Sequence, residues 1–293
     1  MKLSKFIFLF IILFVSFTSC SSDDNTNEVQ EKEEIIVIDT SVAYEESNIS
    51  YGDDENQNFD LYLPANRTVN TKTVILVHGG GWTGGDKKDM EFVVDLMKQD
   101  VKDVAIVNIN YRLADENNKP YPMQINDIST IVKHLKDNKI RYSISDDLGF
   151  IGLSAGAHLS LLWSYAFDTG NNVNMVSSIV GPTNFTDPAY VNASSPELEA
   201  IKLIFGINSQ NTAFLEEVSP FHRVTASAPP TALYYAGQDE LVPTTQGTDM
   251  RDKLASLNVT HEFTLYPDVG HGLRLQEILE TWTSLKIFMD AYL

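Results

Sequence analysis

The sequence predicts an α/β fold, in which a mostly parallel central sheet is covered by helices on both faces. Two observations lead to this prediction. Continuous apolar, β-branched runs recur along the chain, as in strands buried on both faces, for example at residues 73–77 and 104–109. Segments with helical spacing, such as residues 127–135, lie between such runs, and this alternation is typical of parallel sheets. Because ligands bind at the carboxyl ends of such strands, residues that directly follow strands are the candidates for chemistry.

The remaining elements follow in order along the chain. An alternating run at residues 58–63 ends at Pro64 and predicts an edge strand. Further strands are expected at residues 148–153, 175–180, 232–235 and 263–266. A last helix is expected over residues 273–293.

Length and charge limit the possible functions. The chain has 293 residues, enough for one large domain, which we expect over residues 35–293. Its formal net charge is −19 and it has no run of Lys or Arg, so nucleic acid is not an expected partner. The single cysteine, Cys20, excludes an internal disulfide and a cysteine-rich metal site, and we expect no metal centre.

The first residues have the composition of an export signal. Residues 1–19 combine a short basic start, an apolar core and small residues at the end, which is typical of a signal peptide. The apolar core is short for a membrane span of about 20 residues, and an uncleaved membrane anchor is the alternative. Residues 20–34 are polar and acidic without an apolar period, which predicts a disordered tether.

Residues 152–156 read G-L-S-A-G and stand between an expected strand and a helix-like run at residues 157–162. This G-x-S-x-G pattern is typical of a nucleophile elbow, which exposes a serine at the carboxyl end of a strand. The glycines are needed because a side chain at either position would crowd the approach of strand and helix. Since the bare pattern also occurs by chance, Ser154 becomes a candidate nucleophile only together with other parts of a site.

Residues 78–82 read H-G-G-G-W and directly follow the first buried strand. Consecutive glycines let backbone N–H groups approach a ligand closely, as the oxyanion formed in acyl transfer requires. We expect the N–H groups of Gly80, Gly81 and Ala155 to form this oxyanion hole. A flexible loop or a phosphate cradle is the alternative, but the lysine pattern of a P-loop is missing here.

A serine needs a general base to act as a nucleophile at neutral pH. Five of the six histidines are poorly placed: one lies in the glycine loop, two on expected helices, one in an irregular stretch and one at the amino end of a strand. These are, in order along the chain, His78, His134, His158, His222 and His261. We expect His78 to order the glycine loop, His134 to lie at the surface and His158 to be structural. His271 alone lies late in the chain in a glycine-flanked loop directly after a strand, and is the predicted base.

A carboxylate must hold the imidazole in one tautomer and stabilise its cation. Asp239 follows the expected strand at residues 232–235 and is the predicted partner of His271. Glu240, the next residue, and Asp268, in the histidine's own loop, are the alternatives. Asp268 is too close in sequence to reach the imidazole ring easily.

From about residue 55 to its end, the chain resembles an α/β-hydrolase of the esterase/lipase group with an HGGGW loop, and within that group the feruloyl/acetyl-xylan esterase branch. The resemblance rests on the glycine loop, the N-Y-R-L run at residues 110–113, the G-L-S-A-G elbow and the loops around Asp239 and His271. The order Ser154, Asp239, His271 is the order of this fold. The resemblance implies a serine ester hydrolase without a cofactor, acting on a small-molecule or polysaccharide ester.

A second resemblance concerns the amino-terminal region. Cys20, directly after the apolar core, resembles the lipobox of bacterial lipoproteins, in which the signal is cleaved before a cysteine that then carries the lipid. The polar, acidic run after it resembles export signals of surface lipoproteins in some Gram-negative bacteria. This implies an exported protein, anchored to the membrane through lipid at Cys20, at the outer membrane or cell surface.

Residues 181–230 contain six prolines and a helix-like run at residues 197–205. An insertion at this point is expected to cover the site as a lid. The segment before the glycine loop is too short for a large amino-terminal cap, so we expect an open site. Four aromatic residues of the insertion are candidates for an acyl pocket or, equally, for plain packing: Tyr190, Phe205, Phe214 and Phe221.

Two other functions stay open at this point. An arylformamidase, or another amide hydrolase of the same fold, would use the same three residues. A surface lipoprotein that binds glycans without catalysis would need none of them. Comparing turnover of the ester and the amide of one acyl group distinguishes an esterase from an amide hydrolase. Covalent labelling by a fluorophosphonate distinguishes either enzyme from a non-catalytic lipoprotein.

Overall fold

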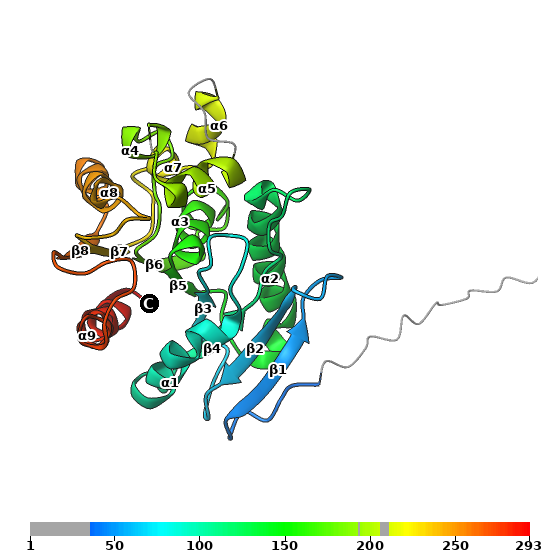
Figure 1. Ribbon diagram of the computed structural model, residues 1–293. Helices are drawn as coiled ribbons and strands as arrows, with labels where there is room; N and C mark the ends of the chain where they lie inside the picture. Colours follow the sequence, from blue (N-terminus) through cyan, green and yellow to red (C-terminus); the bar gives the residue numbers. More distant parts are fainter. Residues whose placement is uncertain (1–35, 193, 206–210) are drawn as a thin grey trace, which may run out of the picture. The chain divides into compact units, whose positions relative to one another are not determined.

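The computed structural model describes residues 36–192, 194–205 and 211–293, which belong to a compact unit from Ile35 to Leu293 (Figure 1). The expected signal peptide, tether and Cys20 lie outside the described residues. The strands of the described part form one sheet in the spatial order β1-β2-β4-β3-β5-β6-β7-β8. In chain order they are β1 (Tyr44–Ser50), β2 (Asn58–Leu63), β3 (Thr73–Val77), β4 (Ala105–Ile109), β5 (Leu148–Leu153), β6 (Val173–Ile179), β7 (Thr231–Ala236) and β8 (His261–Tyr266).

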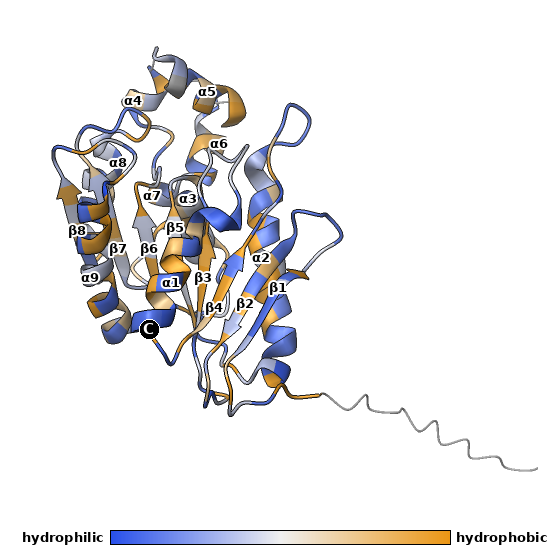
Figure 2. Ribbon diagram, turned by 60° about the horizontal axis from the view of Figure 1, so that its bottom comes forward, coloured by the Kyte–Doolittle hydropathy of each residue, from blue (hydrophilic) through white to orange (hydrophobic). Residues whose placement is uncertain are grey.

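The strands from β3 to β8 run parallel, and only β1 and β2 are antiparallel to their neighbours, which confirms the predicted fold class. The prediction of an edge strand at residues 58–63 is wrong in its place in the sheet. That run is β2, and β1 pairs with its outer side. β1 has few apolar residues, and Figure 2 shows it largely hydrophilic, because an outermost strand contributes little to the core.

Helices cover both faces of the sheet (Figure 1). On one face lie α1 (Glu91–Asp100) and α9 (Leu275–Tyr292); on the other lie α2 (Pro120–Tyr142), α3 (Ala155–Ala166) and α8 (Thr244–Ser256). Strand β3 shows why both faces are covered. Val74 and Leu76 pack into the core under α1 and α9. Ile75 and Val77, on the alternate positions, pack into the core under α2 and α3, so a strand of this kind must be apolar throughout.

Five further helices complete the described part. They are the 3-10 helix η1 (Lys87–Met90) and the α-helices α4 (Pro188–Val191), α5 (Pro196–Phe205), α6 (Thr212–Glu217) and α7 (Pro220–Arg223). Three of the last four begin at a proline, whose fixed φ suits the first helical position. Figure 2 shows α4 and α5 beyond the carboxyl ends of the central strands, where the predicted site lies.

Candidate active site

Ser154 lies in a strained turn at the carboxyl end of β5, directly before α3. Its backbone has φ 51° and ψ −116°, a conformation that persists only where the surroundings enforce it. Its N–H donates to the carbonyl of Ile179 at 2.8 Å. The two glycines permit the turn: a Cβ on Gly152 would lie 2.5 Å from the α3 backbone, and a Cβ on Gly156 would lie 2.2 Å from the β3 backbone.

The structure brings Ser154, His271 and Asp239 together from three distant parts of the chain. His271 Nε2 lies 2.9 Å from Ser154 Oγ, and His271 Nδ1 lies 2.8 Å from Asp239 Oδ2. Because a carboxylate only accepts, Nδ1 carries the proton, and Nε2 is free to accept the hydroxyl proton of the serine. This is the arrangement of a nucleophile with its general base. The His271 side chain is 26% exposed and that of Asp239 only 1%, so the carboxylate is shielded from solvent.

Two backbone N–H groups fix the Asp239 carboxylate. Its Oδ1 accepts hydrogen bonds from the N–H groups of Leu241 and Val242, both at 2.8 Å, which leaves Oδ2 for His271. The two alternatives, Glu240 and Asp268, are exposed, and in the described part of the chain neither makes a hydrogen bond to His271. The structure therefore places Asp239, and neither alternative, at the imidazole.

The glycine loop lies beside the serine. A Cβ on Gly79 would lie 3.2 Å from the Cβ of Ser154, so the loop backbone passes in contact with that side chain. Gly80 and Gly81 have φ of 111° and 57°, which glycine adopts without strain. Within the described ranges, the N–H groups of Gly80, Gly81 and Ala155 donate to no protein acceptor, and are available to a ligand oxygen.

Buried side chains hold the glycine loop in place. His78 Nδ1 donates to the carbonyl of Gly79 at 2.6 Å, and burial lowers the pKa of His78, so the ring is neutral. The hydroxyl of Tyr111 donates to the carbonyl of His78 at 2.9 Å, and Gln124 Nε2 donates to the carbonyl of Trp82 at 2.7 Å. Sequence reasoning assigned no role to Tyr111 or Gln124, although the N-Y-R-L run was a signal for the first.

The other histidines lie elsewhere in the fold. The prediction that His222 falls in an irregular stretch is wrong, since it lies in α7. His158 is buried in α3, as expected. The prediction that His134 lies at the surface is wrong, because the residue is half-buried where α2 packs over β2. Its ring packs edge-on against the ring of Phe59, with 5.3 Å between the two ring centroids. His261 begins β8, at the opposite end of that strand from His271. Across the described ranges, no group of three or more His, Cys, Asp or Glu side chains is arranged to hold a metal ion.

A cavity of about 870 Å³ contains Ser154, His271 and the glycine loop. Its walls are mostly apolar. Helix α5, within the expected lid at residues 181–230, contributes Ala200, Ile201 and Ile204 to them. None of the four aromatic candidates for an acyl pocket lines this cavity; Phe205 and Phe214 line a separate one of about 310 Å³.

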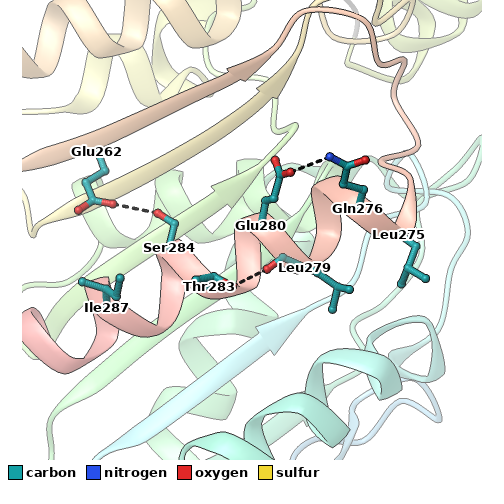
Figure 3. Close-up of a pocket in the computed structure, with 8 residues that line it drawn as sticks. All are labelled: Glu262, Leu275, Gln276, Leu279, Glu280, Thr283, Ser284 and Ile287. Atoms are coloured by element: carbon teal, nitrogen blue, oxygen red, sulfur yellow. Dashed lines mark hydrogen bonds between the residues drawn. The ribbon is translucent and has the colours of Figure 1, made fainter.

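A further, open cavity of about 810 Å³ lies along α9 and β8 (Figure 3). Its acidic side chains are engaged locally: Glu262 accepts a hydrogen bond from Ser284 at 3.2 Å, and Glu280 accepts one from Gln276 at 2.9 Å. It contains no predicted site residue, so the chemistry expected from the sequence belongs to the first cavity.

The mostly parallel sheet, with a strand-turn-helix elbow at β5, defines an α/β-hydrolase fold. The chain belongs to the BD-FAE family, a family of α/β-hydrolase esterases, whose model matches residues 59–254. Membership of this esterase family supports a carboxylesterase-type hydrolase.

Solved structures share the fold at low sequence identity. A truncated carbohydrate esterase from gut microbiota is 20% identical, with a TM-score of 0.68 over 85% of this chain and 98% of that one. An acetyl ester-xyloside bifunctional hydrolase from Caldicellulosiruptor lactoaceticus is 20% identical, with a TM-score of 0.66 over 84% and 96%. Esterase B from Lactobacillus rhamnosis is 19% identical, with a TM-score of 0.65 over 87% of both chains.

Curated relatives match over shorter segments. The kynurenine formamidase of Salmo salar is 29% identical over 115 residues, which are 39% of this chain and 37% of that protein. The kynurenine formamidase of Danio rerio is 27% identical over 126 residues, 42% and 39% of the two chains. This chain thus spans about two fifths of the length of these two relatives.

Proposed function

We propose that this enzyme cleaves carboxylic esters through an acyl-enzyme, with Ser154 as the nucleophile, His271 as the general base and Asp239 as the carboxylate that orients it. One observation carries the proposal: a continuous chain of hydrogen bonds runs from Ser154 Oγ through His271 to the buried Asp239. The available N–H groups of the glycine loop lie beside it.

The steps follow from these contacts. Ser154 Oγ attacks the ester carbonyl carbon as its proton moves to His271 Nε2. The resulting oxyanion accepts hydrogen bonds from the N–H groups of Gly80, Gly81 and Ala155. The carbon–oxygen bond to the alcohol then breaks, and the alcohol leaves with the proton from Nε2. Water, deprotonated by His271, attacks the acyl-enzyme, and Ser154 regains its proton as the carboxylic acid leaves.

The expected substrate is an acetyl or feruloyl ester of a polysaccharide, or a small ester. The family and the carbohydrate esterases among the structures of the same fold support this proposal. The test is release of acetate and ferulate from acetylated and feruloylated xylan, with p-nitrophenyl acetate alongside. Ser154→Ala should lose at least about 10³-fold in kcat on every substrate. Full activity of this variant would exclude the mechanism.

A second candidate is hydrolysis of an arylformamide, which the curated kynurenine formamidases favour. The same three residues would act, and only the leaving group would change from an alcohol to an arylamine. Comparing kcat/KM for phenyl formate, an ester, with kcat/KM for formanilide, the corresponding amide, decides between the two functions. Labelling of Ser154 by a fluorophosphonate would also separate either enzyme from a non-catalytic surface lipoprotein, in which no activated serine is expected.

We also propose export and lipid anchoring at Cys20, at the outer membrane or cell surface of a Gram-negative bacterium. The support is the sequence of residues 1–34 alone. In the part of the chain that the structure describes, no helix is long and apolar enough to cross a membrane. Metabolic labelling with a fatty acid should mark the wild-type protein and not Cys20→Ser.

A further inference from the structure

The cavity that contains Ser154 continues away from the serine between two helices. Val93 and Leu96 of α1 form one wall of this part, and Ile278, Trp282 and Leu285 of α9 form the other. We call it the α1–α9 slot. Figure 1 shows α1 and α9 on the same face of the sheet, and residues of both helices line the same cavity as Ser154 and His271. A bound ester could therefore reach the slot while its carbonyl lies at the serine.

The slot offers almost no polar group to a ligand. The polar atoms in and beside it are already engaged: Trp282 Nε1 donates to Asp100 at 2.8 Å, and Oγ1 of Thr281, which also lines the cavity, lies 2.9 Å from the hydroxyl of Tyr266. Asp89, which also lines the cavity, accepts a hydrogen bond from a backbone N–H at 3.0 Å. A polar substrate group would thus exchange water for apolar side chains, which is unfavourable.

Apolar side chains continue from the slot to the surface. Phe92 of α1 lines the cavity and is 45% exposed. On α9, Leu275 and Leu279 are 63% and 44% exposed, but both line the separate cavity along α9 and β8 (Figure 3). Phe92 therefore makes the outer end of the slot apolar on the α1 side.

We infer that the α1–α9 slot binds an unbranched aliphatic chain of the ester substrate. This inference rests on the proposed ester hydrolysis at Ser154. An acetyl group alone would leave the slot empty, although the whole cavity, at about 870 Å³, lies near the upper end of the range of about 300–1,000 Å³ for ligand sites. The phenolic hydroxyl of a feruloyl group would meet apolar side chains there. An aliphatic chain would fill the slot and has no polar group to bury there.

The expected signature is a preference for long chains. Each methylene that leaves water should raise kcat/KM about fourfold at most, until the slot is full. We expect the octanoyl ester to exceed the acetyl ester by at least about tenfold in kcat/KM.

The experiment measures kcat/KM for p-nitrophenyl acetate, butyrate, hexanoate, octanoate and decanoate with the wild-type protein. A parallel series of acetate esters of butanol, hexanol and octanol distinguishes a chain on the acyl side from one on the alcohol side. Leu96→Trp fills the slot from the α1 wall and should remove the preference for long chains, measured as the ratio of octanoate to acetate kcat/KM within the same variant. Asp95→Trp is the matched control, since Asp95 is exposed on the same helix outside the cavity, and should keep the preference.

Val93→Phe is a second variant of the same wall. It tests whether filling the slot removes the preference for long chains if Leu96→Trp fails to fold. A preference for the shortest chain in both wild-type series, or a long-chain preference that survives both wall variants, would overturn the inference and leave ester hydrolysis intact. Absence of any ester turnover, or full turnover by Ser154→Ala, would instead overturn the proposed function itself. The two failures are therefore distinguishable.

Discussion

The indole N–H of Trp82 donates a hydrogen bond to Nδ1 of His158 at 3.2 Å, which ties the glycine loop to the helix that follows Ser154. On the other side of the ring, His158 Nε2 donates to the carbonyl of Val218 at 2.8 Å. Because an indole N–H only donates and a carbonyl only accepts, the ring is held as the neutral tautomer with its proton on Nε2. One buried imidazole thus connects the glycine loop, α3 and the segment between α6 and α7.

This contact predicts a pH dependence of stability. Burial lowers the pKa of His158 to about 4, whereas a histidine in the unfolded chain titrates near 6.5. Between pH 6.5 and about 4, the His158 ring therefore binds a proton in the unfolded state but not in the native state. The contribution of His158 to stability is full above pH 6.5 and falls by about 1.4 kcal/mol per pH unit as the pH drops toward 4.

Urea unfolding of the wild-type protein and of His158→Gln at pH 7, 6 and 5 measures this effect. Glutamine does not titrate, so carboxylates that titrate in both proteins cancel in the difference. The stability advantage of the wild type should shrink steadily from pH 7 to pH 5. Parallel stability curves for the two proteins would contradict the assignment of a neutral buried ring.

The glycine loop provides a matched pair of substitutions. A Cβ on Gly80 would lie 2.1 Å from the carbonyl oxygen of Gly84, at a φ of 111° that alanine rarely adopts. Gly81 has a φ of 57°, in the left-handed region, and no atom lies within 4 Å of its added Cβ. Gly80→Ala should displace the loop and lower kcat by about 10²-fold or more, whereas Gly81→Ala should cost about 1 kcal/mol of stability and much less activity.

Turnover of p-nitrophenyl acetate and urea unfolding, measured on both variants, check this contrast. A wild-type kcat in Gly80→Ala would show that the position of the Gly80 N–H does not matter for the reaction.

A buried ion pair fixes the helix turn after the glycine loop. The side chain of Lys87 is 4% exposed, and its Nζ donates to Asp60 at 2.6 Å and to the side-chain oxygens of Asn48 and Asn58 at 2.7 and 2.8 Å. Lys87→Met would leave the Asp60 carboxylate without its cation and should cost about 3–5 kcal/mol of unfolding free energy.

The double variant Lys87→Met/Asp60→Leu removes both charges and should recover much of that loss. Urea unfolding of the two single variants and the double variant gives the coupling free energy of the pair. Additive losses would mean that the lysine and the carboxylate do not stabilise one another.

The patterns that predict the fold and single out the candidate residues are local. The apolar run at β3 could be assigned because both of its faces are buried, and Ser154 because the elbow needs glycine at two fixed positions. His271 and Asp239 were selected because each follows a parallel strand, and such strands end at one edge of the sheet.

What the sequence did not indicate depends on contacts between distant segments. The outermost strand β1 was missed because its residues face mostly water and lack an apolar alternation. Helix α2 begins seven residues before the predicted start at residue 127, at Pro120, and its first turns carry Gln124, which holds Trp82. The α1–α9 slot could not be predicted, since it exists only where two helices from opposite ends of the domain meet the same cavity.

Asp239→Asn gives the sharpest test of the proposed mechanism. The N–H groups of Leu241 and Val242 would hold the asparagine oxygen where they now hold Oδ1, so its NH2 group would face His271 Nδ1. Since that group donates, Nδ1 would have to accept, and the ring proton would move to Nε2, opposite Ser154. The base would then be blocked, and kcat should fall by about 10³–10⁴-fold with little change in KM.

Turnover of p-nitrophenyl acetate measures this loss, and Glu240→Gln and Asp268→Asn serve as controls. Both control residues are exposed and make no hydrogen bond to His271 within the described ranges, so both variants should keep wild-type kcat. A large loss in either control, with a small loss in Asp239→Asn, would move the orienting role to that carboxylate. A small loss in all three would mean that the imidazole acts without an orienting carboxylate, because no other acidic side chain of the described part makes a hydrogen bond or an ion pair with it.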